Sequence, residues 1–288
     1  MTSSLTFSRR VCGTHPRRQL LGGGSVGRAA PPFRIYLTIA RSPAVWAITL
    51  AHTLNDCALY MLDDGLPPYL RDVHGLDLSS IGVLLGINGA LKPVVIVVSA
   101  IVADRLRRCV RTLHVRKAVT ALSFLPQAVF LFALSARVVD TPAQIVPLLL
   151  VVAPLNLACN GGGYAVNYLD IAPSLSSLVL AFYNMGGQVM GWMTPWLIGE
   201  LTPYPNGESR SQMELNDDGV LPSDDWVAQL SREWRTVFLI GGCANVAATV
   251  AFLTLASDQV QPWARVARAP DDSSSLAHAR STSSRRRS

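Results

Sequence analysis

Charged residues are scarce in this chain. Asp, Glu, Lys and Arg together make up 15% of its 288 residues, whereas hydrophobic residues make up 50%. A soluble globular domain carries about 25% charged residues, so this chain has more apolar surface than a soluble fold of its length usually buries. The low charge therefore indicates that lipid, rather than water, surrounds most of the protein.

The apolar residues also lack the short alternating pattern of β-barrel strands. They come in unbroken blocks of roughly 20 residues, which is the length that a helix needs to cross the hydrocarbon of a bilayer. Because lipid cannot hydrate free backbone groups, each block must satisfy its own N–H and C=O groups as a helix. The sequence therefore predicts an all-α membrane protein, with the lipid bilayer as its first partner.

Motifs of metal, cofactor and nucleic-acid chemistry are missing as well. The five cysteines include no Cys-x-x-Cys pair, so neither a zinc site nor a disulfide framework is indicated. No Gly-Lys-Ser/Thr follows the glycine runs and no Gly-x-Gly-x-x-Gly opens a βαβ unit, which argues against an enzyme that binds phosphate in a loop. The net charge of +6 lies in the tails and one loop without interleaved aromatics, so no nucleic-acid partner is expected.

Six blocks are candidate transmembrane spans, each bounded to within a few residues. They run roughly over residues 43–62, 80–103, 115–136, 144–168, 175–198 and 234–256.

The loop between the second and third blocks carries six basic residues, namely Arg105, Arg107, Arg108, Arg111, Arg116 and Lys117. Because cytosolic loops are enriched in Lys and Arg, this loop is expected in the cytosol. Six crossings put both termini on the same side, and both tails are rich in Arg, so both termini are expected to be cytosolic. The long acidic loop at about residues 199–233 is then extracellular or luminal.

The spans divide the chain into three parts. Residues 1–42 are expected to be a basic, disordered cytosolic segment, although the absence of acidic residues through about residue 32 also suits a mitochondrial transit peptide. Residues 43–258 form the predicted six-helix transmembrane bundle. Residues 259–288 are rich in Ser and Arg and cannot bury enough apolar surface to become ordered, so we expect a disordered tail.

One acidic residue precedes the arginines at the cytosolic end of the second block. In Val-Ala-Asp-Arg-Leu-Arg-Arg, Asp104 stands directly before Arg105, with Arg108 three residues further on. We predict that these residues form a gating loop, in which the acid pairs with a neighbouring helix end and restrains its movement. The alternative is a basic loop that only follows the positive-inside rule.

Four further sequence blocks occur together: Ser-Pro-Ala-Val-Trp-Ala-Ile, Val-Asn-Tyr-Leu-Asp-Ile-Ala-Pro, Glu-Trp-Arg-Thr-Val-Phe-Leu-Ile and Gln-Pro-Trp-Ala. With the loop signature they resemble, in order and spacing, the anion:cation symporters of the major facilitator superfamily, which include sialin and the vesicular glutamate and sodium–phosphate transporters. The resemblance covers about residues 33–264. It implies the C-terminal, six-helix half of the fold, made of two inverted three-helix repeats that rock against a partner half.

The resemblance also implies a function. We expect transport of a small anion, either an organic anion or phosphate, coupled to an ion or to protons, in the plasma membrane or in the membrane of a vesicle or lysosome. The second half would come from a complementary N-terminal half or from another copy in a homodimer. The alternative is a truncated membrane protein that does not transport and at most interacts with or inhibits a full-length relative.

Polar residues of the first span are candidates for the substrate and ion pathway. His52 and Asp56 are separated by one helical turn, so they can pair as a proton-coupling element. Asn55 stands where sialin-like members have asparagine and vesicular glutamate transporters have arginine, which argues against a glutamate carrier; its alternative role is an interhelical hydrogen bond. Tyr60 matches a family tyrosine that faces the central cavity.

Other candidates lie deeper in the chain. Lys92, in the middle of the second span, needs an acid, a cavity or an anionic ligand, with Asp56 as its expected partner. Asn167 and Tyr168 end the fourth span, and Tyr168 replaces a histidine that is common in relatives. Asp63 and Asp64 are interpreted as surface residues near the outer end of their helix. Glycines in the fourth and fifth spans, Gly161, Gly162, Gly163, Gly186, Gly187 and Gly191, are expected to allow close helix packing.

Overall fold

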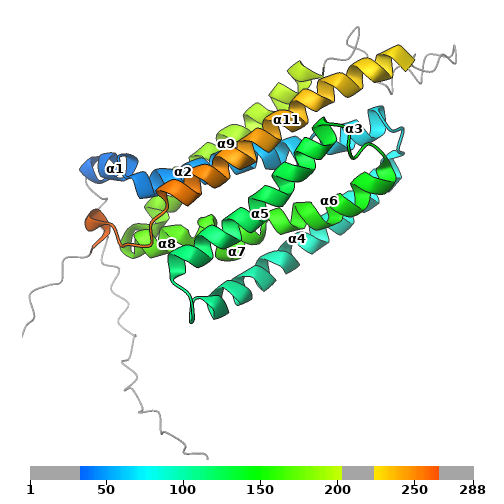
Figure 1. Ribbon diagram of the computed structural model, residues 1–288. Coiled ribbons are helices and arrows are strands. Elements are labelled where there is room, and N and C mark those ends of the chain that lie inside the picture. The colour runs from blue at the N-terminus through cyan, green and yellow to red at the C-terminus, as the bar shows by residue number, and fades with distance from the viewer. Residues whose placement is uncertain (1–32, 203–223, 266–288) are drawn as a thin grey trace, which may run out of the picture.

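The computed structural model describes residues 33–202 and 224–265, and throughout these ranges the regular structure is helical (Figure 1). Six long helical segments account for most of the fold, and four of their helices contain an internal proline. The helices are α1 (Phe33–Ala40), α2 (Pro43–Asp63), α3 (Leu66–Asp72), α4 (Leu78–Leu106), α5 (Thr112–Ser135), α6 (Pro142–Asn156), α7 (Ala158–Gly162), η1 (Tyr164–Val166), α8 (Asn167–Ile171), η2 (Pro173–Leu175), α9 (Ser176–Leu201), α11 (Asp224–Leu255) and η4 (Pro262–Ala264).

Long segments occupy all six predicted blocks, so the all-α membrane fold is confirmed. Four of them are long and apolar enough to cross a membrane: Leu78–Leu106, Thr112–Ser135, Pro142–Ile171 and Gln229–Leu255. Helices α2 and α9 are not among these four. The count of six spans therefore remains a prediction.

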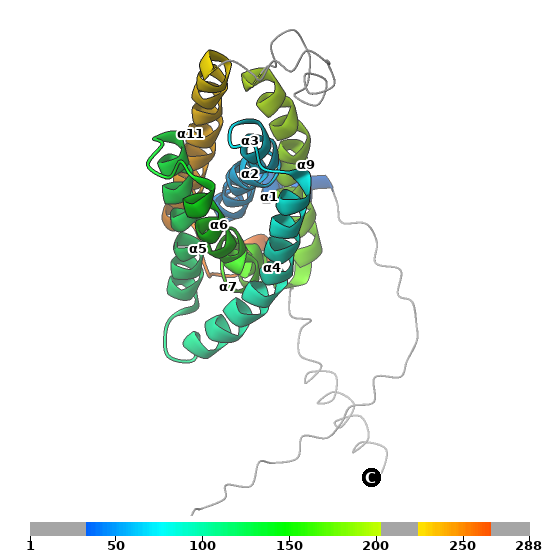
Figure 2. The same cartoon turned by 90° about the vertical axis from the view of Figure 1, so that its right-hand side faces the viewer.

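Helix α2 forms the centre of one part of the bundle. It packs along α11 on one side and along α9 on another, and α11 also packs along α5. Helix α4 packs instead on α6 and α7, away from α11 (Figures 1 and 2). Because α2 lies between its neighbours, its polar side chains can find partners inside the protein rather than in lipid.

The first segment continues beyond the end of α2. Asp64 and Gly65 join α2 to α3 with right-handed helical backbone angles, and the Asp64 N–H donates to the Tyr60 carbonyl at 2.9 Å as in a continuous helix. A Cβ on Gly65 would lie 3.1 Å from the Trp234 ring, so the junction is tightly packed against α11. The helical path therefore runs to Asp72 before it ends.

Glycines bring α7 against α4, as the sequence predicted. A Cβ on Gly161 would clash with the Ile96 carbonyl of α4, and one on Gly162 would lie 3.3 Å from the Ser99 carbonyl. The Ser99 hydroxyl donates to the Ala158 carbonyl at 2.7 Å across the same contact. The absence of side chains at these positions lets the two backbones meet.

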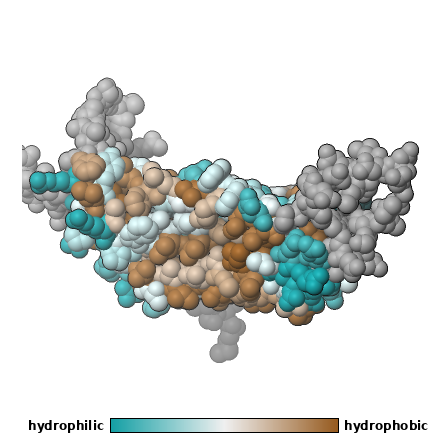
Figure 3. Space-filling view, turned by 90° about the horizontal axis from the view of Figure 1, so that it is seen from above, coloured by the Kyte–Doolittle hydropathy of each residue, from teal (hydrophilic) through white to brown (hydrophobic). Residues whose placement is uncertain are grey.

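The surface follows the pattern of a membrane protein. Figure 3 shows hydrophobic residues along the middle of one face and hydrophilic residues towards its ends. Large apolar side chains are exposed on α4 and α9, for example Val97 at 58% and Trp192 at 73%. Such exposure suits contact with lipid or with another helical bundle rather than with water.

Two of the expected boundaries need correction. Part of the segment predicted to be disordered, Phe33–Ala40, is helix α1, and its Ile39 is buried. At the other end, the Gln261 N–H donates to the Ile171 carbonyl at 2.8 Å and Ala264 is buried, so the chain stays ordered past residue 258. Most of the acidic loop and the ends of both tails lie outside the described residues.

Candidate functional site

The predicted pairing of His52 with Asp56 is present on α2. His52 Nε2 lies 3.3 Å from Asp56 Oδ2, and both side chains are largely buried, with 15% and 12% exposed. Helix α9 closes over the pair, because a Cβ on Gly187 would lie 2.6 Å from His52 Nε2 and would clash with Asp56. The pair is therefore held in the protein interior.

Tyr164 completes this cluster, and the sequence analysis missed it. His52 Nδ1 lies 3.0 Å from the Tyr164 hydroxyl, and Tyr164 is 1% exposed. The Tyr164 N–H donates to Thr120 at 2.9 Å, which fixes η1 against α5. A tyrosine directly after three glycines in an apolar block was the available signal, since a buried hydroxyl needs a partner.

Asn55 makes the interhelical hydrogen bond that the sequence analysis gave as its alternative role. Asn156 Nδ2 on α6 donates to Asn55 Oδ1 at 2.8 Å, and both residues are fully buried. The side chain of Asn55 also interacts with the Tyr164 hydroxyl. A continuous set of polar contacts thus joins Asp56, His52, Tyr164, Asn55 and Asn156.

The expected pairing of Lys92 with Asp56 is wrong. Lys92 Nζ donates instead to Asp63 Oδ2 at 2.6 Å. Asp63 is partly exposed, at 27%, and Asp64 is exposed, which agrees with their interpretation as residues near the surface. Lys92 and Asp63 are 29 residues apart and lie on different helices, so helical spacing could not reveal this pair.

The remaining pathway candidates occupy two different places. Tyr60 lies beside α9, where a Cβ on Gly191 would be 3.4 Å from its hydroxyl. Asn167 Nδ2 donates to the Ser257 carbonyl at 3.0 Å, so it ties α8 to the segment that follows α11. The Tyr168 ring lies 6.0 Å from that of Tyr183, which itself contacts the His52 ring at 5.0 Å. Their roles in a pathway stay predictions.

The residues of the predicted gating loop contact mainly their own helix end. Asp104 lies 3.5 Å from Arg107 and is 72% exposed, while Arg105 and Arg108 are exposed. No described contact joins Asp104 to another helix. The gating role of this loop therefore remains a prediction.

Two other arginines near this loop make the contacts between helices. Arg116, which is 4% exposed, donates to Asp170 at 2.8 Å and to the Gly162 carbonyl at 3.1 Å. Arg111 binds Asp258 through two hydrogen bonds of 3.0 Å each. These bonds hold the pKa of Asp258 below its ordinary value. Both pairs are separated by many residues in sequence, so spacing could not reveal them.

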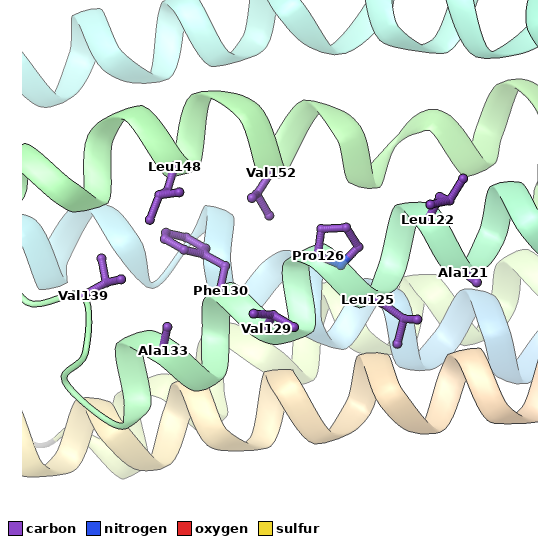
Figure 4. A pocket seen from close by; sticks show the side chains of 10 residues that line it. All are labelled: Ala121, Leu122, Leu125, Pro126, Val129, Phe130, Ala133, Val139, Leu148 and Val152. Atoms are coloured by element: carbon purple, nitrogen blue, oxygen red, sulfur yellow. The ribbon is translucent and has the colours of Figure 1, made fainter.

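An apolar groove lies between α5 and α6 (Figure 4). Its volume is about 600 Å³, and its lining includes Leu122, Pro126, Phe130, Leu148 and Val152. An anion would find no hydrogen-bond donor from these side chains, so the groove does not suit an anionic substrate. The polar cluster around Asp56 is the better candidate site.

The helical bundle, the exposed apolar faces and the buried polar cluster define the chain as an integral membrane protein. Comparison with known proteins refines this class. The chain is 30% identical over 241 residues to the uncharacterized transporter slc-17.2 of Caenorhabditis elegans, covering 82% of this chain and 43% of that protein. It is 28% identical over 231 residues to human sialin, covering 80% and 41%.

A third relative is vesicular glutamate transporter 1 of Xenopus tropicalis, 26% identical over 249 residues, with 86% of this chain and 38% of that protein covered. The resemblance found in the sequence blocks is thus confirmed: the chain is a homologue of the sialin and vesicular glutamate transporter family. It spans less than half the length of these curated relatives. No protein-family model matches the chain.

Proposed function

We propose that the chain acts as one half of an anion transporter that moves an organic anion or phosphate by alternating access, with proton coupling at Asp56. The observation that carries this proposal is the buried set of polar contacts from Asp56 through His52 to Tyr164. Polar groups of this kind inside a membrane bundle are costly, and they usually mark ion or substrate pathways. The relationship to sialin and to glutamate transporters supports the same class of function.

The proposed orientation places the Arg-rich α4–α5 loop in the cytosol. Exposed arginines of that loop and the Arg111–Asp258 pair lie at one end of the bundle, which suits the positive-inside rule. We place the second half against the α4 and α9 surface, where apolar side chains are exposed. A complementary half or a second copy of this chain could supply it.

The test is uptake into liposomes that contain the purified full chain. Labelled phosphate, glutamate or an acidic monosaccharide is offered with and without an inward proton gradient. We expect uptake of at least one of these anions to follow the gradient, and the Asp56→Asn variant, which keeps the side-chain size but cannot bind a proton there, to lose this dependence. Glu200→Gln, which changes an exposed acid on α9, is the matched control and should behave as the parent chain.

The absence of anion uptake would contradict the proposal. If liposomes with the folded chain take up none of the three anions, even at chain-to-lipid ratios at which two copies associate, stand-alone transport is wrong. The alternative of an interacting or inhibitory protein would then be tested by adding the chain to a full-length relative.

A further inference from the structure

The apolar groove between α5 and α6 is open to the surroundings of the bundle. Leu122 and Val129 of α5 are 66% and 65% exposed, and Leu148 of α6 is 41% exposed. Figure 4 shows Leu148 and Val152 pointing from α6 towards α5. Both helices belong to segments that are long and apolar enough to cross a membrane. The opening therefore faces the hydrocarbon of the bilayer rather than water.

The sequence explains why space remains between these two helices. Pro126 lines the groove from the interior of α5, and prolines are common sites at which helices bend. Ala121 and Ala133, which also line it, have side chains too small to fill the space. The ten described residues of the lining are all apolar. The groove can therefore hold a hydrocarbon chain but not a charged group.

The dimensions of the groove favour a single acyl chain. From Ala121 to Ala133 its lining follows α5 for about 18 Å, at ~1.5 Å per residue. The hydrocarbon of one leaflet is about 15 Å thick, half of the ~30 Å core. Spread over that length, a volume of about 600 Å³ gives a mean cross-section of about 33 Å², less than half that of a helix about 10 Å across. A further protein helix is therefore too wide for this space.

Basic residues continue this side of α5 beyond one end of the groove. Lys117 precedes Ala121 by four residues, so the two lie on the same face of the helix, and the exposed His114 is one more turn away. Lys117 Nζ donates to the Leu253 carbonyl at 2.6 Å, which is a neutral acceptor. No carboxylate among the described residues pairs with this ammonium, and two of its three N–H donors are left for another partner. This end of the groove can bind an anionic group.

We propose that the groove binds an anionic phospholipid, with one acyl chain between α5 and α6 and the phosphate headgroup at Lys117 and His114. Basic residues at the membrane surface attract anionic headgroups, and the apolar lining holds the chain. A zwitterionic lipid offers the same chain without the net charge that attracts Lys117. The site lies on a different surface from α4 and α9, where we place the second half, and it does not depend on the proposed transport.

The experiment is native mass spectrometry of the purified full chain in detergent, titrated with phosphatidylglycerol or phosphatidylcholine of identical acyl chains. We expect the first phosphatidylglycerol to bind about fivefold more tightly than phosphatidylcholine, the factor expected for one basic residue. Lys117→Gln should lose this preference, and Lys117→Arg should keep it. Val129→Trp, which fills the groove, should bind neither lipid there, while Val97→Trp, at a similarly exposed position on α4, should bind both as the parent does.

Melting temperatures in the same detergent show whether each variant is folded, and the smaller change Ala133→Leu replaces Val129→Trp if that variant is not. Equal lipid binding by the folded groove variant and by Val97→Trp would overturn the groove as the site. Equal affinities of the parent chain for the two lipids would overturn the role of Lys117. Lipid binding without anion uptake would refute the proposed transport and leave this site standing, and uptake without lipid binding would do the reverse.

Discussion

Helices α2 and α4 differ both in polarity and in how many of their residues are buried inside the protein. Helix α2 buries eleven of its 21 residues although it is too polar to rank among the four candidate spans. Helix α4 buries four of its 29 residues although its most apolar window has a mean hydropathy of 2.1, the highest of the four. In these two helices, therefore, burial inside the protein does not follow mean hydropathy.

The comparison has an energetic basis. An apolar side chain on α4 gains little by leaving lipid, because lipid tails are as apolar as its new neighbours. A polar side chain on α2 loses its water and must find a partner in the protein. We therefore expect substitutions in the buried polar contacts to affect stability far more than substitutions on the exposed face of α4.

The largest expected effect is at Arg116. Arg116→Met leaves Asp170 without its buried cation, and breaking such a pair costs about 3–5 kcal/mol. SDS-induced unfolding followed by circular dichroism measures the loss. The double variant Arg116→Met, Asp170→Leu removes both charges and should recover most of the stability, and Arg108→Met, at an exposed position, should have little effect. Equal losses at Arg116 and Arg108 would contradict the proposed importance of the buried pair.

The next effect is at the contact between α2 and α9. Gly187→Leu places a side chain against His52 and Asp56, and such overpacking costs about 1–3 kcal/mol. Gly199→Leu is the matched control on the same helix, since a Cβ there meets nothing within 4 Å. The melting temperature in detergent should fall for Gly187→Leu only. A similar fall in both variants would mean that the added bulk on α9, and not the contact with α2, explains the change, since Leu has a higher helix propensity than Gly.

A smaller effect is expected at the amide pair between α2 and α6. Asn156→Leu removes the Asn156 amide that donates to Asn55, and hydrogen bonds between membrane helices are worth about 0.6 kcal/mol on average and at most about 1.7. Val97→Ala, on the exposed face of α4, should change the free energy of unfolding less. The comparison between α2 and α4 fails if Val97→Ala is the more destabilising of the two.

Local hydropathy patterns in the sequence predicted most of the long helices, but not the ion pairs between residues far apart in the chain. The blocks at 80–103 and 115–136 match α4 and α5 within a few residues, because length and apolarity alone define them. Helix α11 begins at Asp224, ten residues before the expected start, since its first turns are polar and hydropathy does not register them.

Side-chain partners were predictable only within one helix. His52 and Asp56 pair as expected because a helix fixes the distance between residues i and i+4. The pairing of Lys92 depends instead on a contact between α2 and α4. Asp63 lay just outside the predicted first span, which ended at residue 62, so it was not considered as a partner. Arg116 and Asp170 are 54 residues apart, and only the packing of α5 beside η1 and α8 brings them together.

The smallest predicted effect concerns Asp258, which lies beyond the end of α11 and pairs with Arg111. The paired arginine lowers the pKa of Asp258 in the folded state, so the contact stabilises the fold above the unfolded pKa of about 3.9 and is lost as pH falls through the folded value. Melting temperatures of the parent chain and of Asp258→Asn should therefore converge as the pH is lowered below about 4. The effect should be small because Arg111 is 57% exposed to solvent. A difference that stays constant down to that pH would show that the carboxylate charge does not contribute, and that only the hydrogen bonds hold the segment after α11 in place.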